Sequence, residues 1–392
     1  MTGAAEPDVI LQVTDLDVEY AARRPTRAVR QVSFALRRGE VLGIAGESGC
    51  GKSTLASAIA RLLRPPARLT GGSITFRPAR GQPLDLMALT PEQLRQFRWN
   101  KVSMVFQSAM NALNPVTSIG RQFSDIFAAH RPGMDSAARA RRIRELLEMV
   151  GLDPGRAHGF PHELSGGMRQ RVVVSMALAL EPELVIMDEP TTALDVVVQR
   201  EILDEIERLR EQFGFSVVFI THDLSLLLEV SDRLAVMYAG QIVEYAPTEL
   251  IGRAPAHPYT QGLLGSFPHM RGERRELHGI PGSPPDLRAD FAGCPFAPRC
   301  PSAFEPCHTK PPPLLPVPGR EPGWLAACHL VSEPPVSEPK GAALPGLRSE
   351  ERATREGSAL RRPEASEGTE NERRGKAAPK GARRRAERRK EC

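Results

Sequence analysis

The glycine-rich stretch at residues 46–54, Gly-Glu-Ser-Gly-Cys-Gly-Lys-Ser-Thr, constrains the fold of this chain more than any other feature. The apolar run Val41–Ala45 before it predicts a strand, and residues 53–63 after it predict a helix. The glycines let the backbone curl so that successive N–H groups point at one anion, beside the positive end of the helix dipole. Lys52 then reaches the outer phosphates of a nucleotide, and the Ser53 hydroxyl binds Mg²⁺.

The alternative for this stretch is a glycine turn that only caps a helix, which the preceding strand and the Lys-Ser pair disfavour. Because backbone amides and a neighbouring lysine lower thiol pKa values, we hypothesise that the cysteine of this stretch is reactive and protected by nucleotide. As a phosphate cradle, the stretch contributes all of its residues to nucleotide binding: Gly46, Glu47, Ser48, Gly49, Cys50, Gly51, Lys52, Ser53 and Thr54.

Two carboxylates follow a second apolar run. Residues 184–187 are apolar, as in a central parallel strand, and Asp188 and Glu189 come directly after them. Asp188 is placed to hold the Mg²⁺ shell, and Glu189 to polarise the water that attacks the terminal phosphate. A helix cap is the alternative for this acidic pair, but the cradle upstream favours the metal interpretation.

A second anion-binding helix start is expected at Ser165-Gly166-Gly167, because a serine cap and two glycines precede an apolar helical pattern. This site has neither a lysine nor a following carboxylate strand. It is either a simple N-cap or half of a site that a second molecule completes.

Charge and hydropathy limit the classes of function. No apolar run approaches the roughly 20 residues that span a bilayer, and residues 1–8 lack the pattern of a signal peptide. We therefore expect a cytosolic chain with reduced cysteines. Residues 348–392 carry 15 Lys/Arg against 9 Glu, a net charge of +6, whereas the whole chain of 392 residues carries +5. The rest is thus near neutral and offers no electrostatic case for nucleic acid.

Further elements follow from the apolar periodicity. Residues 108–180 are predicted to be largely helical, Thr90 is predicted to cap a helix, and residues 239–240 are predicted to turn a hairpin. The predicted strands are residues 9–20, 29–36, 41–45, 73–76, 102–106, 184–187, 217–220, 234–237 and 241–244.

Six motifs stand in the order found in ABC-transporter ATPase subunits, which the chain resembles. They are the cradle, Gln107, residues 164–171, Asp188-Glu189, residues 193–195 and residues 221–223. Residues 114–115, 191–195, 237–240, 257–260 and 294–301 are similar to the oligopeptide/dipeptide importer branch, and most similar to its D-type ATPase. The resemblance covers residues 9–330. It departs at Ser108-Ala109, where the family commonly has Asp-Pro.

The resemblance implies an α/β P-loop ABC ATPase at residues 8–245, with a RecA-like core, an antiparallel β subdomain and an α-helical subdomain at about 108–180. A small Cys-rich extension at 246–330 and a disordered charged tail at 331–392 follow. The implied catalytic residues are Glu189, His222, Gln107 and Lys52. Ser53, Gln107 and Asp188 would bind Mg²⁺.

The remaining implied roles concern the nucleotide. Tyr20 would stack on adenine, and Gln107 would link the attacking water to the membrane subunits. His222 would contact the γ-phosphate, and Asp195 would order the dimer seam. Ser165, Gly166 and Gly167 would bind the γ-phosphate of the nucleotide that the partner ATPase holds.

Four cysteines lie in a proline-rich stretch with little apolar material, which suggests an inorganic group as a staple. Cys294, Cys300, Cys307 and Cys328 are separated by five, six and twenty residues, without the paired Cys-x-x-Cys spacing of zinc sites. The related importers imply a [4Fe–4S] cluster. Zinc and plain reduced thiols are the alternatives, with His308 and His329 as further ligands.

The function implied is that of an ATP-hydrolysing subunit, peripheral on the cytoplasmic face of the cell membrane, which powers peptide import. Its expected partners are an F-type ATPase, two permease subunits and, indirectly, an extracytoplasmic peptide-binding protein. Nickel or glutathione import is an alternative, as is a non-transport ABC protein in DNA repair or on the ribosome. Those proteins usually show a long coiled-coil insertion or two ATPase heads, and this sequence has neither. A guanine-reading Asn-Lys-x-Asp motif is also missing.

Overall fold

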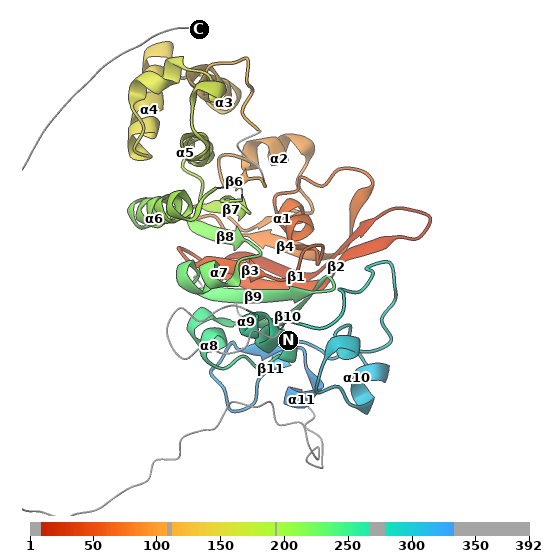
Figure 1. The fold of residues 1–392 in the computed structure, drawn as a ribbon. Coiled ribbons are helices and arrows are strands. Elements are labelled where there is room, and N and C mark those ends of the chain that lie inside the picture. Colours follow the sequence, from red (N-terminus) through yellow and green to blue (C-terminus); the bar gives the residue numbers. More distant parts are fainter. Residues whose placement is uncertain (1–8, 108–111, 193, 267–278, 333–392) are drawn as a thin grey trace, which may run out of the picture. The chain divides into compact units, whose positions relative to one another are not determined.

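The structure is a computed structural model that describes residues 9–107, 112–192, 194–266 and 279–332 (Figure 1). The expected tail from residue 333 onward, the departure at Ser108-Ala109 and Ala193 of the 193–195 motif lie outside the described residues. Within the described ranges, every helix is too short or too polar to span a bilayer.

The N-terminal part forms a four-stranded antiparallel sheet in the order β2-β1-β4-β5. In the central strand β1, Val13 pairs with Phe34 on one side and with Ile74 on the other. All three side chains are buried, as expected for the apolar positions of alternating strands. The antiparallel subdomain is therefore confirmed, with strands β1 (Val9–Tyr20), β2 (Thr26–Arg37), β4 (Ala67–Phe76) and β5 (Leu84–Asp85).

A mixed eight-stranded sheet forms the centre of the fold, in the order β11-β12-β10-β9-β3-β8-β7-β6. Strands β6, β7, β8, β3 and β9 run parallel, and β10, β12 and β11 continue the sheet in antiparallel pairs. The bounds of the strands are β3 (Val41–Ala45), β6 (Val102–Val105), β7 (Leu184–Asp188), β8 (Ser216–Ile220), β9 (Arg233–Tyr238), β10 (Gln241–Pro247), β11 (Leu315–Pro316) and β12 (Leu325–Ala326).

The central strands are apolar along their whole length because both faces of the sheet are buried. In β3, Leu42 and Ile44 join a core shared with the antiparallel sheet. Val41 and Ala45 point to the other face and join the core that includes the helical region. The same two-residue alternation divides β7 and β8 between the two cores. This arrangement confirms the predicted RecA-like core.

The helices follow their predicted caps. Thr90 caps α2 (Pro91–Phe97) through a reciprocal capping box with Gln93. Helix α1 (Lys52–Ile59) is shorter than predicted, because the backbone turns at Arg61, which has a φ of 55°. The helical subdomain contains α3 (Ile119–His130), α4 (Ser136–Met149) and α5 (Gly166–Ala177), and the core helices after it are α6 (Val196–Phe213) and α7 (Leu224–Val230).

Strands β9 and β10 lie side by side in Figure 1 and form the predicted hairpin. Its two turn residues, Ala239 and Gly240, have φ angles of 50° and 81°. A positive φ at both central positions is the geometry that matches the twist of a two-residue hairpin.

The C-terminal segment (residues 246–332) is joined to the central sheet, which the sequence patterns did not predict. Strand β12 pairs with Glu244 and Tyr245 of β10. The buried carboxylate of Glu244 accepts hydrogen bonds from Trp324 Nε1 at 2.9 Å and from the backbone N–H groups of Ala256 at 2.7 Å and His257 at 3.1 Å. The segment contributes α8 (Thr248–Arg253), α9 (Pro258–Gly265), a 3₁₀ turn η4 (Ala297–Arg299), α10 (Glu305–Thr309) and α11 (His329–Ser332).

His257 makes the stability of this junction pH-dependent. Its Nδ1 caps α9 by accepting from Tyr259 N–H at 3.0 Å. Burial lowers the pKa of His257 from 6.5 to about 4, although a hydrogen bond to the backbone of Ala327 acts in the opposite direction. As the pH falls from 6.5 to about 4, His257 therefore becomes protonated in the unfolded chain but stays neutral in the folded chain. The free energy of unfolding should drop by about 3 kcal/mol from this residue.

His257→Asn keeps a capping oxygen and does not titrate. Urea unfolding at pH 7 and pH 4.5 should show a smaller loss of stability for this variant than for the unmodified chain. Replacing the exposed His158 by Asn should leave the loss unchanged. An identical acid loss in the His257 variant would contradict the assignment.

Candidate functional site

The glycine-rich stretch folds as a tight loop between β3 and α1. Gly46, Gly49 and Gly51 have φ angles of 146°, 79° and 109°, which side chains rarely adopt. A Cβ on Gly46 would lie 2.3 Å from the carbonyl oxygen of Met237, and one on Gly51 would lie 2.1 Å from that of Ala28. The loop is therefore pressed against β9 and β2, and glycine is required at both positions.

Lys52 lies inside this loop, with 6% of its surface exposed. Its Nζ donates to the carbonyl oxygens of Gly46 at 2.8 Å and Glu47 at 3.0 Å. These carbonyls hold the ammonium group within the curve of the loop. An anion that enters the loop therefore meets the lysine together with the N-terminus of α1.

A hydroxyl and a carboxylate meet beside the loop. Ser53 Oγ lies 3.1 Å from Oδ1 of Asp188, which is buried at the end of β7. Burial raises the pKa of Asp188, the hydrogen bond from Ser53 lowers it, and the nearby Glu189 raises it further. A desolvated carboxylate beside a hydroxyl is a donor set that Mg²⁺ prefers. These residues fit the expected metal.

Glu189 lies at the centre of a second group. One carboxylate oxygen, Oε2, accepts from Gln107 Nε2 at 2.8 Å and from Thr192 Oγ1 at 3.0 Å. The other, Oε1, lies 3.3 Å from His222 Nδ1. Glu189 directly follows β7. Gln107 follows β6, and His222 follows β8, each with one residue in between, so that three neighbouring strands supply this group. The sequence patterns assigned no role to Thr192. Its position three residues after Glu189 was the one sequence feature that could have indicated this contact.

Tyr20 stands at the end of β1 and is joined to the first turn of α1. Its hydroxyl lies 3.0 Å from Thr54 Oγ1. The residue is half-buried, near the start of this helix. Its stacking on adenine stays a prediction.

The second helix start is formed as expected but stands apart from the cradle. Ser165 caps α5 by accepting from Met168 N–H at 3.2 Å, and Asp195 caps α6. A Cβ on Gly167 would lie 2.6 Å from Val198 Cγ1, so the starts of the two helices are packed together. None of the hydrogen bonds among the described residues joins Ser165 to the cradle. Val196 is 81% exposed beside this helix start.

The hypothesis of a reactive Cys50 is wrong in its premise. The side chain is buried against the loop, and burial raises the pKa of the thiol. The charge and hydrogen bond of Lys52 act in the opposite direction but do not compensate. Desolvation therefore disfavours the thiolate form of Cys50.

The four cysteines of the C-terminal segment are brought together. Cys294 N–H donates to the carbonyl of Cys307 at 2.8 Å. Burial is the main cause that raises the pKa of Cys294 to about 11 and that of Cys328 to about 12, and neighbouring cysteines contribute to both shifts. In the part of the chain that the structure describes, no group of three His, Cys, Asp or Glu side chains is arranged to hold a metal ion.

The sequence patterns did not predict two contacts between the cradle and the C-terminal segment. Glu47 N–H donates to the hydroxyl of Tyr259 in α9 at 3.0 Å. The Glu47 carboxylate accepts two hydrogen bonds from Arg299, from Nη1 at 2.7 Å and from Nη2 at 2.9 Å. The resemblance included the stretches that contain Tyr259 and Arg299, but no local pattern connects them to the cradle.

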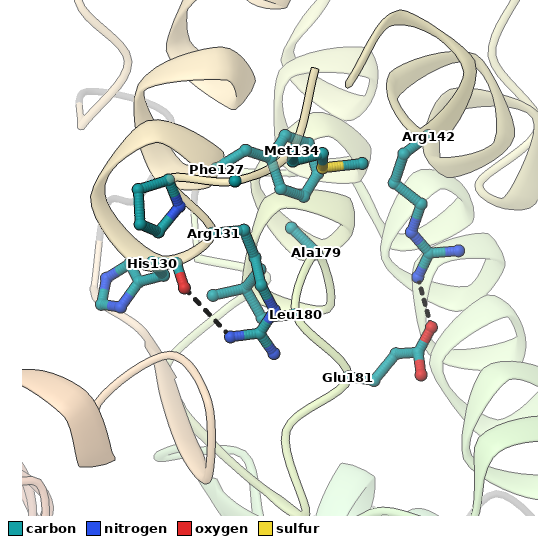
Figure 2. Close-up of a pocket in the computed structure, with 10 residues that line it drawn as sticks. Phe127, His130, Arg131, Met134, Arg142, Ala179, Leu180 and Glu181 are labelled. Carbon is teal, nitrogen blue, oxygen red and sulfur yellow. Dashed lines mark hydrogen bonds and ion pairs between the residues drawn. The ribbon is translucent and has the colours of Figure 1, made fainter. Parts of the chain in front are cut away.

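A cavity of about 550 Å³ lies in the helical region and involves none of the predicted site residues (Figure 2). It is lined by the end of α3 and by residues 131–134, Arg142 and residues 179–181. An ion pair of 2.7 Å between Arg142 and Glu181 borders it.

The cradle geometry predicts unequal effects of two glycine substitutions on stability. Gly39 and Gly51 both have positive φ angles, 72° and 109°, but only Gly51 has a backbone oxygen in the place of a Cβ. Gly39→Ala should lower the free energy of unfolding by about 1 kcal/mol. Gly51→Ala should lower it by about 3 kcal/mol or more, because the loop must also move. Equal midpoints in urea unfolding would contradict this geometry.

Comparison with known proteins agrees with these features. Residues 29–192 match the ABC transporter family, and residues 243–307 match the family described as oligopeptide/dipeptide transporter, C-terminal region. A probable peptide ABC transporter ATP-binding protein of Sinorhizobium fredii is 44% identical over 342 residues, which cover 85% of this chain and 98% of that protein. The dipeptide transport ATP-binding protein DppD of Bacillus subtilis is 44% identical over 302 residues, 76% of this chain and 88% of that protein.

Among solved structures, the dimeric ATP-binding cassette MJ0796 bound to ADP and Pi is similar, with a TM-score of 0.54 and 27% identity. The match covers 61% of this chain and 99% of that one. The phosphate loop, the carboxylate strand and the helical subdomain thus have the architecture of an ABC ATPase. The chain belongs to the ATP-binding subunits of ABC transporters, in the oligopeptide/dipeptide group.

Proposed function

We propose that this chain hydrolyses ATP to power peptide import through an ABC transporter. One observation carries the proposal: Glu189 is fixed at the end of a central strand, between Gln107 and His222, next to a phosphate loop that encloses Lys52. This constellation provides a base, a phosphate cradle and a cation site at one edge of the sheet. The related peptide and dipeptide transport ATP-binding proteins match this chain over 98% and 88% of their own length, which supports peptides as the cargo rather than nickel or glutathione.

Each residue of the site has a separate task in this mechanism. Lys52 and the backbone N–H groups of the loop bind the β- and γ-phosphates. Ser53, Asp188 and Gln107 would hold Mg²⁺, which neutralises charge on the phosphate oxygens when it is bound. Glu189 orients the attacking water and accepts its proton through hydrogen bonding.

The hydrogen bonds of Glu189 suit it for this role. Gln107 and Thr192 both donate to Oε2, which fixes the carboxylate. The other oxygen, Oε1, faces His222. A water bound at Oε1 would therefore lie on the side of the γ-phosphate, which His222 is proposed to contact. Fixed geometry of this kind lowers the barrier because the groups need little reorganisation during the reaction.

A partner ATPase would complete the site. The Ser165 loop stands apart from the chain's own cradle, and Val196 and Val197, which follow Asp195, are 81% and 68% exposed. Such exposure at a helix start supports coverage by another molecule. We assign the partner as an F-type ATPase, whose nucleotide would contact Ser165, Gly166 and Gly167, with Asp195 at the seam and Tyr20 on adenine.

The membrane subunits would bind near Gln107. Phe106 is 46% exposed directly before this glutamine, and Val116 is 82% exposed shortly after it. Two permease subunits would bind these exposed apolar side chains. Gln107, which contacts Glu189, would then connect the permease subunits to the site of hydrolysis. The chain would then lie on the cytoplasmic face of the membrane, and a peptide-binding protein on the other side would deliver the cargo.

Glu189→Gln tests the proposed catalytic role. The variant keeps the shape and most hydrogen bonds of the side chain but removes the base. The rate of ATP hydrolysis in the assembled transporter should fall by about 10²–10⁴-fold, with ATP binding retained. The exposed Glu249→Gln, which breaks only a surface ion pair with Arg253, is the matched control and should keep the full rate.

Two outcomes of this assay would count against the proposal. Full hydrolysis by the Glu189 variant would remove it from the mechanism. Ser165→Arg should spare ATP binding and stop hydrolysis at the partner's site; normal turnover of that variant would contradict the shared-site arrangement.

For the cysteine group we propose a [4Fe–4S] cluster with a structural or sensory role. The support is that Cys294, Cys300 and Cys307 all act electrostatically on Cys328, and that Cys294 N–H donates to the carbonyl of Cys307. Four thiols in a segment with little secondary structure suit a multi-iron group, which requires wider sulfur spacing than one zinc ion.

Chemical analysis of anaerobically purified protein tests the cluster. We expect about four iron and four sulfide per chain, with a broad visible absorption band. Cys307→Ser should lose both, whereas Cys392→Ser, outside this group, should keep them. Stoichiometric zinc, or a colourless protein free of both metals, would overturn the proposal.

A further inference from the structure

The phosphate loop carries an acidic side chain that needs a partner. Glu47 is the second residue of the loop, and its carboxylate is only partly exposed, at 25%. ATP brings several negative charges to the same loop. A carboxylate without a counter-charge would repel these phosphates, and partial burial would strengthen the repulsion by lowering the local dielectric constant.

Arg299 supplies the counter-charge from 252 positions away in the sequence. Its guanidinium forms a two-pronged pair with the Glu47 carboxylate, at 2.7 and 2.9 Å, and the arginine side chain is 6% exposed. Two-pronged pairs of this kind fix orientation as well as charge. The arginine therefore both neutralises Glu47 and fixes the direction of its side chain.

Arg299 is itself held by the C-terminal segment. Its Nε donates to the carbonyl of Pro281 at 2.7 Å, and Nη1 also donates to the Tyr238 hydroxyl at 3.2 Å. Tyr238 packs against Tyr259 and Phe296, with ring centroids 4.6 and 5.3 Å away. Arg299 is thus fixed by Pro281 and by Tyr238, which is itself packed in an aromatic cluster.

Tyr259 reaches the loop from the same cluster. Its hydroxyl accepts the backbone N–H of Glu47 at 3.0 Å. This N–H is therefore turned towards Tyr259 and is not available to a phosphate in this geometry. The contact fixes the peptide at the start of the loop, while the later N–H groups remain to bind the anion.

We propose that Arg299 and Tyr259 are positioning residues that hold the phosphate loop in its nucleotide-binding shape, so that the C-terminal segment sets the affinity for ATP. The inference rests on the proposed ATPase function. Cys300 directly follows Arg299, so the residue that pairs with Glu47 is adjacent in the chain to the cysteine group. By linkage, ATP must in turn stabilise the C-terminal segment.

The experiment measures the dissociation constant of a slowly hydrolysed ATP analogue on the full chain, by fluorescence titration. Arg299→Ala should weaken binding by about tenfold or more, because it leaves the Glu47 carboxylate uncompensated. The loss should appear in KM for ATP more than in kcat. Tyr259→Phe, which keeps the ring, should weaken binding by about threefold or more.

A double variant separates charge from general damage. Glu47→Gln with Arg299→Met removes both charges and keeps an unbranched apolar side chain, which should restore affinity to within about threefold of the unmodified chain. The matched control is Arg288→Ala, which loses only an exposed ion pair with Asp286 and should bind normally.

The outcomes are distinguishable. If the unmodified chain binds no ATP analogue, the proposed function fails. If it binds, and a folded Arg299→Ala variant binds equally well, the positioning role is overturned. If Arg299→Ala does not fold, Arg299→Lys decides, since it keeps the charge and loses the two-pronged contact. Weaker binding by a Lys variant with an unchanged unfolding midpoint supports the proposal, and equal binding overturns it. A double variant as weak as Arg299→Ala refutes the charge argument.

Discussion

The parallel pairing of β3, β8, β7 and β6 is the constraint on which the site depends. Because the carboxyl ends of parallel strands meet at one edge of a sheet, the residues that follow them are brought together without any long-range recognition of their own. The cradle follows β3, Asp188 ends β7 and Glu189 follows it, while Gln107 and His222 follow β6 and β8. The pairing is stable because both faces of these strands are buried, and alternate side chains enter two different cores.

The same edge concentrates negative charge, and the fold compensates for it unequally. Burial raises the pKa of Asp188, and Ser53 only partly offsets that effect, which leaves a site that gains from a cation. Glu189 receives hydrogen bonds from Gln107 and Thr192, which fix its carboxylate. Glu47, by contrast, is fully paired by Arg299. The carboxylates of the site are thus distinguished by their partners: one is suited to a metal, one to water and one to holding the loop.

The C-terminal segment is part of the architecture that shapes the cradle. Strand β12 extends the central sheet, and the buried Glu244 is satisfied by Trp324 and by two backbone N–H groups of this segment. Three aromatic rings pack together between this junction and the loop. They belong to Tyr238 in β9, Tyr259 in α9 and Phe296 directly before η4. A charged group buried in this way is costly unless every partner is in place. The nucleotide site and the C-terminal segment that carries the cysteine group are therefore parts of one packed structure.

The sequence by itself determined the local elements and most of the candidate residues of the site. The glycines of the cradle, the apolar strand before Asp188 and Glu189, and the caps of α2 and α5 are signals carried by neighbouring residues, and the structure has each of these elements. Only the tertiary structure decided the shorter α1, the contact of Thr192 with Glu189, the burial that raises the pKa of Cys50, and the contacts of Tyr259 and Arg299 with Glu47. The physical reason is that desolvation and pairing depend on which distant segments are packed together, and residues 252 positions apart share no local pattern.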